Sequence, residues 1–128
     1  MDNGLNLEGY VIVYPGTGPI QDGAKAHNCI ILKDDTENGD IYIVPICSFH
    51  DGADKTLLLD QQTPALSLKR KSYLAYYAGK KVSRKATFIK IHSGELKHFG
   101  PIPRDLFDKM IAGVRESDET EPWFAKAF

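Results

Sequence analysis

Two short polar segments, each beside an apolar strand-like stretch, hold the residues of this chain best suited to chemistry. Lys25 and His27 come shortly before the stretch CIIL, and Ser48 directly follows IYIVPIC. Binding and catalytic groups often lie where strands emerge from a core. A histidine near neutral pH can accept or donate a proton, while a lysine or a hydroxyl can stabilise an oxyanion. His27, Lys25 and Ser48 are therefore the candidate catalytic residues.

Each of these residues also has an ordinary structural interpretation. A histidine before a strand is often held by hydrogen bonds, a serine commonly caps a turn, and a lysine on a loop is often only solvated. His50, two residues after Ser48 and next to Asp51, is a further candidate for proton transfer. The four histidines and two cysteines show neither CxxC nor HxxxH spacing, so we expect no metal and no cofactor.

The second chemical feature is an acid-free window between Gln61 and Gly94. It holds eight of the sixteen Lys and Arg residues and none of the seventeen Asp and Glu residues, in a chain of net charge −1. Basic side chains neutralise phosphates, and aromatic faces provide platforms for bases. The window therefore predicts a nucleic-acid-binding surface, with a merely solvated charged face as the alternative. The predicted contact residues are Lys69, Arg70, Lys71, Tyr73, Tyr76, Lys80, Lys81, Arg84 and Lys85.

Several other function classes are excluded by pattern. The glycine-rich stretch GTGPIQDG lacks the GK[ST] ending of a phosphate-binding Walker loop. Apolar runs reach only about six residues, far short of the ~20 that span a bilayer, so no membrane partner is expected. The N-terminal stretch MDNGLNLEGY does not resemble a secretory signal, and we expect a cytoplasmic location.

The elements that must position these residues are mostly short strands. Apolar or alternating runs separated by turn residues predict strands at Tyr10–Tyr14, Cys29–Leu32, Ile41–Ile46, Leu57–Leu59 and Ala86–Ile91. Residues 72–78 (SYLAYYA) fit either a strand or a helical turn.

A different pattern fills the last third of the chain. Leu106, Met110 and Val114 form one stripe of a predicted helix at about 104–115, with Pro103 in its first turn. An aromatic tail at 121–128 is expected to pack back on the body or to contact another chain. Together these elements predict a single mainly β (α+β) domain spanning 1–128: a small closed barrel of five to seven short antiparallel strands with a C-terminal helix.

The order of these motifs resembles the MazF/PemK-like toxins of the CcdB/MazF superfamily. The shared features are a strand, a glycine-rich loop, a basic residue before an apolar strand, and a strand that closes with Pro-Ile-Cys-Ser at 45–48. The stretch KSYLAYYAG is also similar to an element of distant relatives. The resemblance covers roughly residues 8 to 115.

This resemblance implies an SH3-like barrel that cleaves single-stranded RNA without metal, using the 2′-hydroxyl of the RNA as nucleophile and leaving a cyclic phosphate. Ser48 occupies the hydroxyl position of the family, whereas His27 stands where the family has an arginine, with Lys25 two places earlier. A homodimer and a separate antitoxin protein are also implied. The alternative is a non-catalytic nucleic-acid-binding or protein-binding module on the same barrel, which the missing arginine favours.

Overall fold

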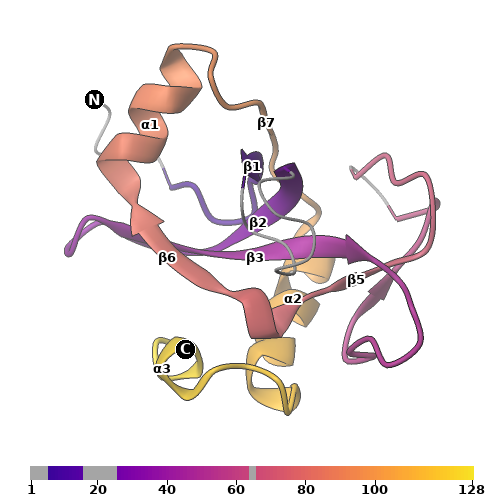
Figure 1. The fold of residues 1–128 in the computed structure, drawn as a ribbon. Coiled ribbons are helices and arrows are strands. Elements are labelled where there is room, and N and C mark those ends of the chain that lie inside the picture. The colour runs from indigo at the N-terminus through magenta and orange to yellow at the C-terminus, as the bar shows by residue number, and fades with distance from the viewer. Residues whose placement is uncertain (1–5, 16–25, 64–65) are drawn as a thin grey trace.

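The protein folds around a mostly antiparallel sheet with α-helices packed against it (Figure 1). The computed structural model describes residues 6–15, 26–63 and 66–128. The strands are β1 (Val11–Pro15), β2 (Ala26–Asp35), β3 (Asp40–Ser48), β4 (Leu58–Leu59), β5 (Ser72–Leu74), β6 (Lys80–Ser83) and β7 (His98–Phe99). The helices are the 3-10 turn η2 (Tyr76–Ala78), α1 (Arg84–His92), α2 (Arg104–Glu116) and α3 (Pro122–Ala125).

Strand β3 is the centre of the sheet. It pairs with β2 along one edge, while β6 pairs with Asp40–Ile43 and β5 pairs with Ile46–Ser48. The strand order is β4-β5-β3-β2-β1-β7, with β6 branching from β3, so the described strands form an open path. The sheet is therefore mainly antiparallel as predicted, but it is not closed into the barrel that we expected.

The strand predicted at Ala86–Ile91 is wrong, because this segment lies in helix α1. The hydroxyl of Ser83 caps the helix by accepting a hydrogen bond from the Ala86 N–H at 3.1 Å. Thr87 and Phe88 are both buried, and such adjacent buried positions suit a helix better than an alternating strand. The alternation that suggested two faces of a strand therefore came from a short helix with a mixed surface.

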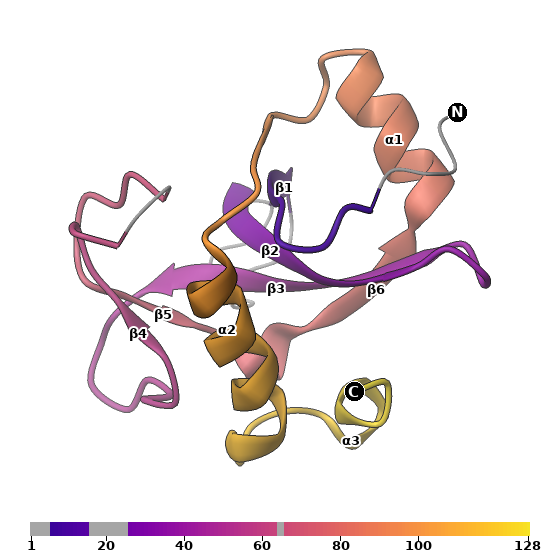
Figure 2. The ribbon, with the colours of Figure 1, turned by 180° about the vertical axis from the view of Figure 1, so that it is seen from behind.

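Hydrophobic clusters lie on both faces of β2 and β3. On one face Ile30, Val44 and Met110 belong to a cluster that α2 completes, and Figure 2 shows α2 in front of these strands. On the other face Ile31 and Phe88 belong to a second cluster, closed by α1. Because neighbouring residues of β2 point to opposite faces, its continuous apolar run reflects burial on both sides.

The aromatic tail packs back on the sheet. Phe124 in α3 is fully buried, its ring centre 5.7 Å from that of Tyr42. Phe128 lies 5.4 Å from the Phe124 ring, whereas Trp123 keeps 48% of its surface exposed. Gly79 leaves room for this packing, since a Cβ there would lie 2.8 Å from the Phe124 ring. Of the helices in the described ranges, none is long and apolar enough to cross a membrane.

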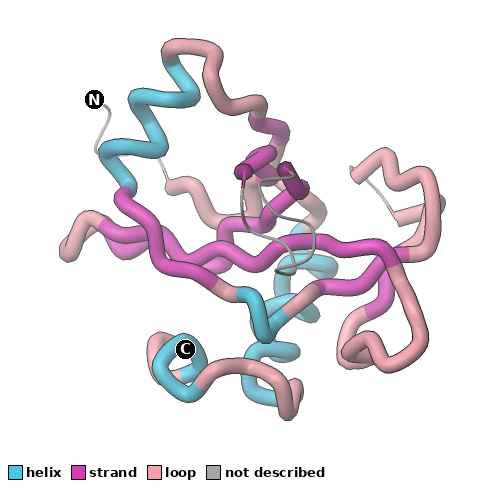
Figure 3. The backbone as a smooth tube through the Cα atoms, viewed as in Figure 1, coloured by secondary structure: helices cyan, strands magenta, loops and turns pink. Residues whose placement is uncertain are grey.

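The connections between β3 and β5 gather at one end of the sheet (Figure 3). One runs from Phe49 to Leu57, and the other includes residues 66–71 just before β5. Both meet the C-terminal end of β3, where the pairing with β5 brings Ser48 opposite Ser72. This end of the sheet carries the candidate site.

Candidate functional site

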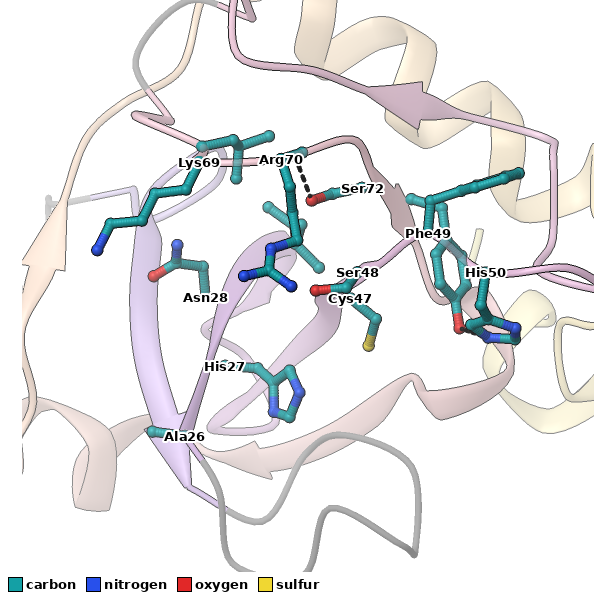
Figure 4. A pocket seen from close by; sticks show the side chains of 13 residues that line it. Ala26, His27, Asn28, Cys47, Ser48, Phe49, His50, Lys69, Arg70 and Ser72 are labelled. Carbon is teal, nitrogen blue, oxygen red and sulfur yellow. Dashed lines mark hydrogen bonds between the residues drawn. The ribbon is translucent and has the colours of Figure 1, made fainter.

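A cleft of about 710 Å³ opens at the C-terminal end of β3. It lies between the first residues of β2, the last residues of β3 and the segment that leads into β5 (Figure 4). The lining contains two cations and no carboxylate among the described residues, so the cleft is suited to an anion. Its lining residues are Ala26, His27, Asn28, Ile46, Cys47, Ser48, Phe49, His50, Leu68, Lys69, Arg70, Ser72 and Tyr73.

Two of the three predicted catalytic residues line this cleft. His27 comes from β2, where it pairs with Tyr14 of β1, and it is half-buried. Ser48 is exposed at the end of β3 and pairs with Ser72. The pairing of Cys29 with Pro45 places the start of β2 beside the end of β3, which brings these side chains to one cavity. Lys25, the third predicted residue, lies outside the described residues.

The segment before β5 is held in place through its main chain. The Gln61 amide donates to the carbonyl of Lys69 at 2.8 Å, and the Ser72 hydroxyl donates to the carbonyl of Arg70 at 3.0 Å. The Phe49 N–H donates to the carbonyl of Lys71 at 3.0 Å. Three consecutive carbonyls therefore accept hydrogen bonds, two from residues distant in the sequence and one from Ser72, which fixes where the basic side chains emerge.

A histidine and a tyrosine form the far wall of the cleft. The Tyr73 hydroxyl lies 3.4 Å from His50 Nε2, and the two rings meet edge to face at 5.6 Å. His50 Nδ1 lies 2.8 Å from the carbonyl oxygen of Asp51, which can only accept, so Nδ1 carries a proton. Burial, with a further contribution from nearby Tyr77, raises the pKa of Tyr73, so its hydroxyl stays protonated and can donate.

The loop that carries Phe49 and His50 is tied to the C-terminal end of α2. Asp54 accepts hydrogen bonds from the hydroxyls of Thr56 and Ser117, the latter being the residue directly after α2. Burial alone would raise the pKa of Asp54, but these hydrogen bonds outweigh it and hold the pKa below its ordinary value. The carboxylate therefore anchors the wall of the cleft to the helix.

The predicted nucleic-acid contacts divide into separate groups. Lys69, Arg70 and Tyr73 line the cleft, although Tyr73 is buried and offers no open face for stacking. Lys71 turns to the Phe49 ring, with its Nζ 4.4 Å from the ring centre. Outside the cleft, Lys80 and Lys81 lie on β6 and Lys85 lies on α1, all exposed.

Two residues of the cationic window lie in the interior instead. Tyr76 is fully buried, and its hydroxyl donates to the carbonyl of Met110 at 2.7 Å. Arg84 is also buried, and its Nε lies 2.7 Å from Asp34 Oδ1 in an ion pair. Neither side chain is available to a base or a phosphate at the surface, so both have structural roles.

The cleft also contains residues that were not among the predicted site residues, such as Asn28, Cys47 and Phe49. Each adjoins a predicted residue in the sequence, Asn28 beside His27 and the other two beside Ser48. The sequence could have indicated these residues only through their position beside a candidate residue at a strand end. In the part of the chain that the structure describes, no three His, Cys, Asp or Glu side chains cluster as metal ligands.

A scan against protein-family models and a search of curated protein sequences found no significant match to this chain. The assignment of function therefore depends on the geometry of the cleft and on the order of the sequence motifs.

Proposed function

We propose that the cleft binds single-stranded RNA and cleaves it by attack of a 2′-hydroxyl on the adjacent phosphate. The observation that carries this proposal is that His27 and Ser48, from two neighbouring strands, line one cleft that has two cations and no carboxylate among its described residues. A proton-transfer group, a hydroxyl donor and positive charge are the groups that such a reaction needs.

In this reaction the neutral imidazole of His27 takes the proton from the 2′-hydroxyl, and the 2′-oxygen attacks phosphorus. The P–O2′ bond forms as the P–O5′ bond breaks, and the leaving 5′-oxygen takes a proton from water. The products are a 2′,3′-cyclic phosphate and a 5′-hydroxyl. The Ser48 hydroxyl donates to a non-bridging oxygen as negative charge develops. A contact of Lys25 with the same phosphate stays a prediction.

We also propose a MazF/PemK-like, SH3-like fold in which the sheet is a partly open form of the small barrel. The support is the meander β1-β2-β3, continued by β5 and β6 along the remaining edge of β3 and followed by a C-terminal helix.

We also propose a cytoplasmic location. Cys29 and Cys47 are buried thiols, which suits a reducing compartment such as the cytoplasm.

The direct test is incubation of the pure protein with end-labelled single-stranded RNA in EDTA. We expect cleavage to a cyclic phosphate, no cleavage of a 2′-O-methyl strand, and a loss of about 10²-fold or more for His27→Ala. Ser48→Ala should lose about tenfold or more, while Lys109→Ala, at an exposed position of α2 outside the cleft, serves as the control. Intact RNA after incubation with the wild-type protein, or full activity in both cleft variants, would contradict the proposal.

The second candidate is a binding module without catalysis, because the arginine of the family is replaced by His27. Its RNA affinity would fall log-linearly with salt, with a slope of about −0.7 for each phosphate contacted. Binding with this slope and without cleavage would support the non-catalytic RNA-binding module. A shallow slope together with tight binding of an acidic protein, such as an antitoxin, would select a protein-binding role.

A further inference from the structure

The acid-free window contains three consecutive cations, Lys69, Arg70 and Lys71, whose surroundings differ. Lys69 and Arg70 line the cleft, whereas Lys71 is placed over the ring of Phe49. In Figure 4 the guanidinium of Arg70 points into the cleft toward Ser48 and His27. The position of this side chain, rather than the charge of the window as a whole, indicates a specific subsite.

We propose that Arg70 is the cation that contacts the reacting phosphodiester, in a subsite that it forms with Ser48 and Asn28. This inference rests on the proposed function, and it assigns the positive charge at the phosphate to a residue outside the strand-end motifs. The three donors come from three different segments: the lead-in to β5, the end of β3 and the start of β2.

Two features of the surroundings favour Arg70 for this role. Its main chain is anchored by the Ser72 hydroxyl, and the carbonyls on either side are anchored by Gln61 and Phe49. In addition, no carboxylate is among the described residues that line the cleft. The guanidinium is thus positioned in the described cleft without an internal counter-charge.

The chemistry of the guanidinium matches a phosphate better than that of an ammonium group. Its planar fork can donate two parallel hydrogen bonds to two non-bridging oxygens, which a lysine cannot do. Ser48 and Asn28 add neutral donors from the two neighbouring strands. The expected ligand is therefore a phosphodiester within a strand, with its two non-bridging oxygens facing Arg70.

The test separates binding from cleavage by using two probes. A fluorescent 2′-O-methyl hexanucleotide reports binding by anisotropy, because it lacks the nucleophile and cannot be cleaved by this route. Labelled RNA of the same sequence reports cleavage. We compare Arg70→Ala and Arg70→Lys with Lys109→Ala, a control of equal charge change at an exposed lysine of α2 that does not line the cleft.

We expect Arg70→Ala to weaken binding of the hexanucleotide about tenfold or more and to lower the salt slope by about 0.7, as one phosphate contact is lost. Arg70→Lys should keep the slope yet lose about tenfold or more in cleavage, because the fork is missing. Lys109→Ala should change binding by about twofold or less, since an exposed charge outside the cleft contributes little. Guanidinium ion, added at a concentration that leaves the protein folded, should restore part of the cleavage by Arg70→Ala.

Equal weakening by Arg70→Ala and Lys109→Ala would overturn the subsite, because general charge attraction would explain both. Cleavage by Arg70→Ala at the wild-type rate would also overturn it while leaving the proposed function intact. Arg70-dependent binding without cleavage by the wild type would support the subsite and contradict the catalytic proposal. If the wild type binds no hexanucleotide, the subsite is wrong.

Discussion

The hydroxyl of Tyr76 occupies the space that a side chain on Gly113 would need. A Cβ at position 113 would lie far inside van der Waals contact of that oxygen, which donates to the carbonyl of Met110 one turn earlier in α2. The 3-10 turn after β5 and the C-terminal helix therefore approach each other through a tyrosine and a glycine. This contact joins the segment that follows the cleft to the helix that covers the core.

We expect Gly113→Ala to lower the free energy of unfolding by about 1–3 kcal/mol, because the added methyl group overpacks a buried contact. Tyr76→Phe, which removes the hydroxyl, should cost about 1 kcal/mol through the lost hydrogen bond. Combined with Tyr76→Phe, Gly113→Ala should cost less than it does alone. Urea unfolding of the two single variants and the double variant measures the coupling, and strictly additive costs would contradict the steric explanation.

Phe124 and Trp123 form a matched pair of aromatic substitutions in the tail. Phe124 is fully buried against Tyr42, so Phe124→Ala should cost about 3–5 kcal/mol of stability. Trp123 is half exposed, and Trp123→Ala should leave thermal unfolding within a few degrees of the wild type.

The same pair tests the predicted homodimer. If the tail contributes to a twofold interface, Trp123→Ala should shift sedimentation toward the monomer without loss of stability. Truncation of the chain at Glu121 is a poor test, because it also removes Phe124 from the core. Unchanged sedimentation of a dimeric Trp123→Ala variant would show that the tail is not the interface.

Asp54 should make stability depend on pH in the acid range. Its pKa in the folded protein lies below the ordinary value of 3.8, so the native state favours the carboxylate. The stabilisation is complete well above pH 3.8 and is lost as the pH falls through the lower folded pKa. Asp54→Asn should therefore be less stable than the wild type at about pH 7, with a difference that narrows toward about pH 3. Chemical denaturation at both pH values measures this, and a constant difference would exclude the carboxylate as the cause.

Arg84 and Lys85 are neighbours in the cationic window with different expected effects. Arg84→Ala removes the partner of buried Asp34, which also accepts the N–H of Leu7, and should cost about 3–5 kcal/mol. Lys85→Ala should leave stability within about 0.5 kcal/mol, because Lys85 is exposed. Thermal unfolding distinguishes the two, and equal stabilities would contradict a structural role for Arg84.

Much of the strand and helix pattern was predictable because local signals agreed with the tertiary structure. The runs containing Ile12, Ile30 and Ile43 are apolar and bounded by turns, and strands lie at all three. A helix also lies where Pro103 and the apolar stripe predicted one, at Arg104–Glu116. Strands and helices of this kind each bury one face, and the apolar residues of that face recur at a regular spacing in the sequence.

The remaining features depend on partners that are distant in the sequence. In the sequence Arg84 looks like any other surface cation. Its buried role depends on Asp34, which lies fifty positions earlier and becomes its partner only in the folded protein. The path of the sheet depends on β5 and β6 sharing one edge of β3, and short strands such as Leu58–Leu59 carry too few residues to show this. In the cleft, the position of His27 and Ser48 at strand ends could be predicted from the sequence. The direction of the Arg70 side chain could not, because it depends on the hydrogen bonds that hold the main chain of residues 69–71.

The pairing of β3 along both edges has a consequence for local opening of the fold. Its amides and carbonyls bond to β2 on one side and to β6 and β5 on the other, whereas β4 and β7 end the sheet. Hydrogen exchange should therefore be slowest along β3 and fastest at those margins. Ser48 is the last residue of β3, the strand expected to open last. When β4 and β7 open locally, the wall of the cleft that β3 forms should therefore stay folded.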